Sequence, residues 1–139
     1  MKRLVSVLAI ILLASLAVVA ETNWQFLTPV KNARFVYVTS YDGPEFSPGL
    51  IFRDREAIAT VQQAMRDSGY TLVYRPEQAD MIIAVESRPS EDVLAVYSPE
   101  SWRHGTYLWR TMGKNGFASQ VLVRQLETAL SQMEGKKLS

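Results

Sequence analysis

The first twenty residues limit most strongly what this chain can fold into, because they hold its longest apolar run and yet resemble a removable leader. A basic start, Met1–Arg3, precedes the apolar stretch Leu4–Ala20, which ends in two short side chains, Val18 and Ala20. A basic start, an apolar stretch and short residues at the cleavage positions are typical of a secretory signal peptide. We therefore expect residues 1–20 to be removed and residues 21–139 to form a single domain.

A retained membrane anchor is the alternative for this segment. The apolar run has about 17 residues, fewer than the roughly 20 that cross a bilayer core, and the polar Glu21 follows it directly. Both features favour cleavage over anchoring. There is no Cys for lipid attachment near the cleavage point, and the short charged start is typical of bacterial exported proteins. We expect the mature protein in the periplasm.

The composition of the mature chain excludes several classes of protein. Cleavage would remove two of the 15 basic residues and none of the 14 acidic residues, which gives a net charge of −1. A near-neutral domain has no electrostatic reason to bind nucleic acid or an anionic membrane surface. The chain has no Cys, which removes thiol catalysis and thiolate metal sites. We expect no cofactor, no metal and no nucleic acid, and membrane contact only through an uncleaved leader.

Apolar periodicity predicts two amphipathic helices, over about Asp54–Ser68 and Ala118–Glu134. In the first helix apolar residues recur every three or four positions from Ile58, and in the second they form a longer stripe centred on Leu126. Gly69 is placed to end the first helix in a left-handed conformation. Both helices therefore have one face to bury.

Runs of β-branched and aromatic residues predict four or five strands. The most continuously apolar of them suits a central strand that is covered on both faces. The strands on either side of the first helix are expected to be parallel, and the last two antiparallel. This order predicts an α+β fold: a two-layer sandwich of one mixed four- to five-stranded sheet with two helices on one face. The expected strands are Phe35–Thr39, Tyr70–Tyr74, Met81–Val85, Val93–Tyr97 and Tyr107–Trp109.

Motifs for catalysis are weak in this chain. His104 is the one histidine, and a small periplasmic hydrolase that combines it with Ser98 or Ser101 and an acid is the alternative function. No nucleophile-elbow motif accompanies it, so an ordinary loop histidine is favoured. Acids in the predicted loops, such as Asp42 and Asp92, are interpreted as solvated charges.

The strongest candidate for binding is a cluster of aromatic and arginine residues late in the chain. Trp, Tyr and Arg are the residue types that dominate binding energy at protein interfaces. Alternation would place Tyr107 and Trp109 on one strand face, where they could instead pack under a helix with the arginines outside. A strand edge nearby could also accept a strand of a partner. The candidate binding residues are Trp102, Arg103, Tyr107, Trp109 and Arg110.

The segment Ile58–Val85 resembles a layout found in small bacterial envelope proteins. There a helix ends at Gly-Tyr, here Gly69-Tyr70, and an Ala-Asp step, here Ala79-Asp80, opens an apolar strand. The segment is similar to uncharacterised lipoprotein-like domains of unknown function. The chain departs from them in having no lipidation Cys and no Asp-x-x-x-Gly segment before Trp109-Arg110.

This resemblance implies a noncatalytic role in the envelope, and it carries no active-site residue across because the matching residues are structural. Together with the leader, it gives the expected function: an exported periplasmic binding or assembly module with an envelope protein as its partner. The partner's identity and the oligomeric state do not follow from the sequence.

The leader gives a direct prediction. The mature protein should begin near Glu21 and should be recovered in the periplasmic fraction, because the leader has the three parts that signal peptidases recognise. Intact mass spectrometry of the fractionated protein measures the N-terminus. An intact Met1 in the membrane fraction would establish an anchored protein.

Overall fold

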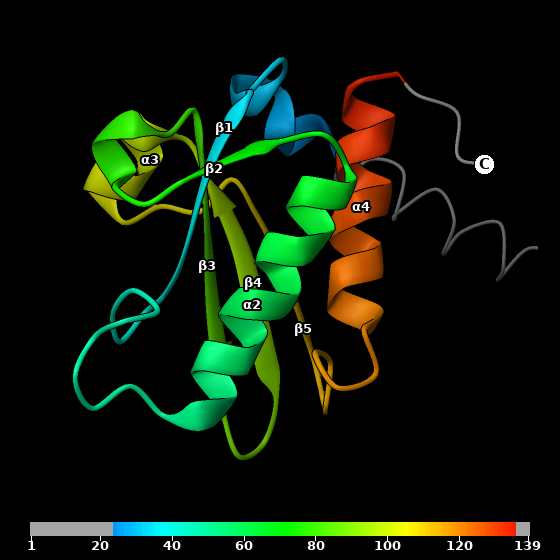
Figure 1. Cartoon of the computed structure of the whole chain (residues 1–139). Coiled ribbons are helices and arrows are strands. Elements are labelled where there is room, and N and C mark those ends of the chain that lie inside the picture. The colour runs from blue at the N-terminus through cyan, green and yellow to red at the C-terminus, as the bar shows by residue number, and fades with distance from the viewer. Residues whose placement is uncertain (1–23, 136–139) are drawn as a thin grey trace, which may run out of the picture.

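The computed structural model describes residues 24–135, so the predicted leader lies outside the described residues (Figure 1). Helices and strands alternate along the first part of the chain, and a long helix ends it. In chain order the elements are η1 (Trp24–Val30), β1 (Phe35–Ser40), α2 (Phe52–Asp67), β2 (Thr71–Val73), η2 (Pro76–Gln78), β3 (Met81–Ser87), β4 (Asp92–Tyr97), α3 (Pro99–His104), β5 (Trp109–Gly113) and α4 (Val121–Met133).

The five strands form one mixed sheet in the order β2-β1-β3-β4-β5. β1 pairs in parallel with β2 and β3, and β4 pairs antiparallel with β3 and β5. β3 is the middle strand, and its side chains from Met81 to Val85 are all buried. The predicted α+β class, the mixed sheet and the central position of this strand are therefore confirmed.

α2 and α4 lie on the same face of the sheet, as Figure 1 shows. The apolar stripes of both helices are buried against alternate residues of the central strands, including Val36, Ile83 and Val96. Leu27 and Val30 of η1 close this core at one end, in a segment outside the predicted helices and strands. The main core is thus the layer between the two helices and the sheet, as predicted.

The second face of the sheet is covered at one end by α3, which the sequence pattern does not predict. Trp102 of α3 makes an edge-to-face contact with Tyr97, with ring centroids 5.0 Å apart. The helix begins directly after the predicted strand Val93–Tyr97: the Ser98 hydroxyl accepts from the Ser101 amide, and the Ser101 hydroxyl accepts from the Ser98 amide. This reciprocal cap stabilises a helix too short to show an apolar period.

Two predicted boundaries also shift. The last strand runs over Trp109–Gly113 and not Tyr107–Trp109. The last helix begins at Val121 and not at Ala118, because Gln120 adopts a left-handed conformation (φ 63°) that a continuing helix cannot contain. The end of α2 is as predicted: Gly69 has φ 93°, and the Tyr70 amide donates to the Met65 carbonyl at 3.0 Å.

The core gives a stability prediction. Leu126 is fully buried on α4, so replacing it with Ala removes packed methyl groups and leaves a cavity. L126A should lower the free energy of unfolding by about 2–5 kcal/mol. Chemical denaturation measures this loss, with E127A, at a partly exposed position of the same helix, as the control. An unchanged unfolding midpoint for L126A would contradict the burial of this stripe.

Candidate functional site

The structure divides the five predicted binding residues between the two faces of the sheet. Trp109 is only 8% exposed and belongs to the core beneath α4, whereas Tyr107 precedes β5 and is 44% exposed. The expectation that these two aromatics share one strand face is therefore wrong. Tyr107 instead stacks on Arg110, with the guanidinium carbon 4.6 Å from the ring centroid. Trp102 lies on α3, and its neighbour Arg103 is exposed.

A groove between β5 and α4 contains two of the five predicted residues, Trp109 and Arg110. Its volume is about 460 Å³. We call it the β5–α4 groove. Polar side chains of α4 make most of its second wall, and the sequence analysis did not single them out. The lining residues are Trp109, Arg110 and Thr111 of β5, and Val121, Arg124, Gln125, Thr128, Ala129 and Gln132 of α4.

The walls of this groove are tied together and carry positive charge. The Thr111 hydroxyl donates to the side-chain oxygen of Gln125, which joins β5 to α4. Arg124 donates to the backbone carbonyl of Ser119 at 3.0 Å, which fixes its guanidinium beside the start of α4. The lining includes no carboxylate, and Arg124 is its charged side chain on the α4 side, because Arg110 alternates with Trp109 and Thr111 and its guanidinium lies against Tyr107. The groove is therefore a preformed site with an attraction for negatively charged groups.

The edge of the sheet beside this groove is open. β5 pairs with β4 on one side, and no other strand within residues 24–135 pairs with it. The unpaired backbone groups of an edge strand can bond to a further strand. The groove and the open edge together form a place where an extended chain could add to the sheet and lay side chains against α4.

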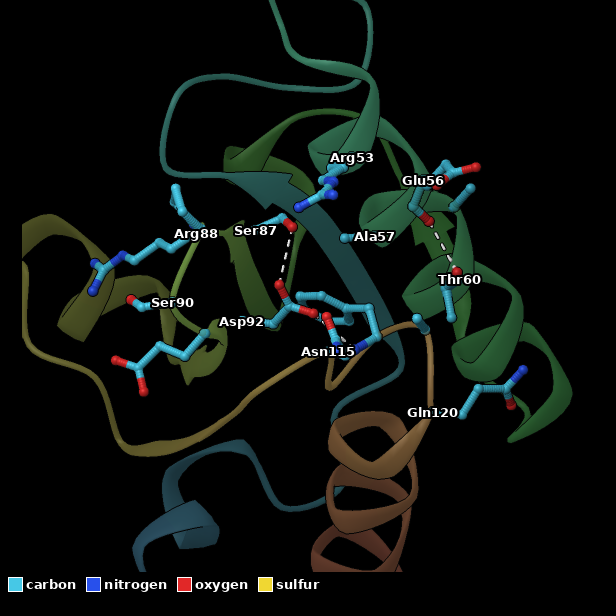
Figure 2. A pocket seen from close by; sticks show the side chains of 15 residues that line it. Arg53, Glu56, Ala57, Thr60, Ser87, Arg88, Ser90, Asp92, Asn115 and Gln120 are labelled. Carbon is cyan, nitrogen blue, oxygen red and sulfur yellow. Dashed lines mark hydrogen bonds between the residues drawn. The ribbon is translucent and has the colours of Figure 1, made fainter.

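A second hollow lies at the end of the sheet where β3 turns into β4, and Figure 2 shows it from close by. Its volume is about 520 Å³, and it lies between the start of α2, the turn after β3 and the segment before α4. We call it the hairpin pocket. Its labelled polar side chains include Arg53, Ser87, Asp92 and Asn115.

Asp92 holds the hairpin pocket together. One of its carboxylate oxygens accepts from the Ser87 hydroxyl at 2.9 Å, and the other accepts from the Phe117 amide at 3.0 Å. The prediction of a solvated acid at this position is therefore wrong, since Asp92 is buried. Both of its oxygens have partners inside the protein. Asp92 thus fixes the chain before α4, and its role here is structural.

The rim of the hairpin pocket carries charges of both signs. Arg53 and Arg88 lie on it together with Glu56 and Glu91. Arg88 is already paired with Glu86, at 2.8 Å between the charged atoms. Because cations and anions are mixed, the pocket offers no single charge to a ligand. The hairpin pocket is larger than the β5–α4 groove.

A buried carboxylate, Asp54, lies in the first turn of α2 and is only 1% exposed. One oxygen accepts from the Ser87 amide at 2.8 Å, and the other has no hydrogen-bond partner among the described residues. Burial raises the pKa of Asp54, and the nearby carboxylates of Asp42 and Glu86 raise it further. Asp54 is therefore a destabilising charge at neutral pH.

His104 ends α3 and is exposed. Within residues 24–135 its imidazole makes no hydrogen bond, while the hydroxyls of Ser98 and Ser101 serve the cap of α3. The hydrolase alternative thus has no contact in the described part of the chain to support it. That part also holds no group of three His, Cys, Asp or Glu side chains arranged for a metal ion. Nor does any of its helices have the length and apolar character to cross a membrane.

Comparison with known proteins does not assign this chain to a family. No family model, curated protein or solved structure matches it. The resemblance of Ile58–Val85 to envelope domains stays an interpretation of the sequence.

The buried Asp54 predicts a specific dependence of stability on pH. Because its pKa is raised in the folded state, the folded state binds the proton more readily than the unfolded state. The favourable contribution is complete below the unfolded pKa and is lost as the pH rises through the folded pKa. D54N removes this titration, so its stability relative to wild type should increase from pH 4 to pH 8.

Urea denaturation of both proteins across this pH range measures the difference in the free energy of unfolding. Comparing the two proteins at each pH removes the contributions of the other titrating groups. A difference that stays constant with pH, or falls, would contradict the raised pKa of Asp54.

Proposed function

We propose that this chain is an exported, noncatalytic binding or assembly module of the bacterial envelope, which acts in the periplasm after loss of its leader. The basic and apolar parts of residues 1–20 and the short side chains that end them support export. The resemblance of Ile58–Val85 to envelope domains supports the compartment. The tied walls and open strand edge of the β5–α4 groove support binding as the activity.

The proposed mode of binding is addition of an extended partner segment to β5. The observation that carries it is the position of the groove: it lies along the one long edge strand of the sheet and has α4 as its second wall. Backbone hydrogen bonds to β5 would supply affinity without regard to sequence. Alternate side chains of an added strand point to opposite faces, so every second one would face α4.

The chemistry of the groove indicates which partner fits. Arg124 would attract a carboxylate, and no acid in the lining opposes it. Trp109, Val121 and Ala129 give the groove an apolar floor. A segment whose α4-facing side chains, at every second position, include both acidic and small apolar residues would satisfy both features. The partner is therefore proposed to present such a segment in extended form.

A peptide titration tests this proposal. The probe is a fluorescent ten-residue peptide in which every second residue is in turn Glu or Val, with Thr between them, and the same peptide with Lys in place of Glu is its charge-reversed control. The peptide with Glu should bind, and R124E should weaken binding by about tenfold or more through repulsion of the carboxylates. R66E makes the same charge change on the exposed end of α2, and should leave binding unchanged. Fluorescence anisotropy measures the affinity of each peptide for the wild type and for each variant.

A second measurement tests whether the peptide pairs with the backbone of β5. Two further peptides are N-methylated at every second residue, one at the odd positions and the other at the even positions. Each lacks the amide donors along one edge of the strand. One of them should lose binding and the other should keep it. Equal binding of these two peptides would exclude strand addition. Equal effects of R124E and R66E would exclude the β5–α4 groove as the site.

A further inference from the structure

The hairpin pocket contains hydrogen-bonding side chains that the rest of the protein does not use. The Arg53 guanidinium and the Asn115 amide both line it, and neither side chain makes a hydrogen bond or an ion pair to another residue within residues 24–135. Figure 2 shows both of them turned toward the interior of the pocket, on either side of the hydrogen bond between Ser87 and Asp92. The pocket therefore has free donors, and a free acceptor in the Asn115 amide, in position for a ligand.

Neither sign of charge is favoured inside this pocket. Arg53 brings one positive charge to the interior, and the buried Asp92 brings one negative charge. The rim likewise has Arg88 together with Glu56 and Glu91. An anion would be attracted by Arg53 but repelled by Asp92, and a cation would meet the reverse. The ligand that fits best is therefore neutral and rich in groups that both donate and accept hydrogen bonds.

We propose that the hairpin pocket binds a neutral saccharide, with Arg53 and Asn115 as its binding residues. A sugar hydroxyl both donates and accepts a hydrogen bond, so it can use either kind of free group in the pocket. The Asn115 amide presents its oxygen and its NH₂ group side by side, which matches two adjacent hydroxyls of a sugar ring. The Arg53 guanidinium would donate to further hydroxyl or ring oxygens.

The size and walls of the pocket fit a compact ring. Its volume of about 520 Å³ lies within the range of roughly 300–1,000 Å³ that is usual for small-molecule sites. α2, the β3–β4 turn and the segment before α4 bound it on three sides, which suits a ring better than an extended peptide. Ala57 and Phe117 give it apolar wall surface for the C–H groups of a sugar. No residue lines both this pocket and the β5–α4 groove, so saccharide binding is independent of the strand addition proposed above.

A glycan array followed by NMR tests the proposal. The array carries neutral di- and trisaccharides of glucose, galactose, mannose and N-acetylglucosamine, and the same saccharides with a sulfate or a carboxylate added. At least one neutral saccharide should bind, and its charged counterparts should bind more weakly. In a ¹H–¹⁵N titration with that saccharide, the amide signals of Ser87 and Phe117 should shift, while those of Thr111 and Gln125 in the β5–α4 groove should not.

Substitutions then identify the binding side chains. R53M and N115G should each raise the Kd of the saccharide by about tenfold or more, because each removes hydrogen bonds to it. N115G keeps the left-handed backbone of this position (φ 52°), which glycine adopts freely. R66M makes the same change as R53M at the exposed far end of α2 and should leave the Kd unchanged. The proposal is overturned by an array without a bound neutral saccharide, by signal shifts in the groove instead of the pocket, or by equal effects of R53M and R66M. It is also overturned if triglycine binds at the pocket more tightly than any saccharide, which would make it a peptide site.

Discussion

The burial of β3 on both faces is the constraint on which the rest of this structure depends. Met81, Ile83 and Val85 face the layer of α2 and α4, while Ile82 and Ala84 face the other side. Two long helices can cover only one of these faces. The protein therefore needs α3, η2 and the aromatic side chains near them on the second face, and their positions follow from the need to exclude water from Ile82.

The position of the β5–α4 groove depends on a carboxylate that does not line it. Asp92 joins the start of β4 to the segment before α4 through Ser87 and Phe117. Next to Phe117 the backbone of Gly116 packs against Leu122, where a β-carbon would collide with the leucine side chain. These contacts fix where α4 begins, and so they set its separation from β5. The contacts that position the groove thus lie at the start of α4, beside Val121 of its own lining.

The elements predicted correctly are those whose apolar pattern lies entirely within the element. The apolar run of β3 and the helical periods around Ile58 and Leu126 each lie within one element, and all three elements are confirmed. α3 was not predicted, because six residues are too few to show an apolar helical period. The burial of Asp92 was missed because its partner Phe117 lies 25 residues away. Trp109 and Arg110 were found from residue type, but the polar wall contributed by α4 looked like an ordinary solvated helix face.

The two edges of the sheet differ in length, and this difference governs how the molecule could assemble. β2 pairs with β1 over three residues only, whereas β5 pairs with β4 over five. A very short edge strand gives an incoming strand little to bond to. A sheet that accepts a strand at one edge only can pair with one partner or with a second copy of itself. It cannot extend into a fibre by adding strands at both edges. Each contact made at β5 uses the edge that further growth of the sheet would need.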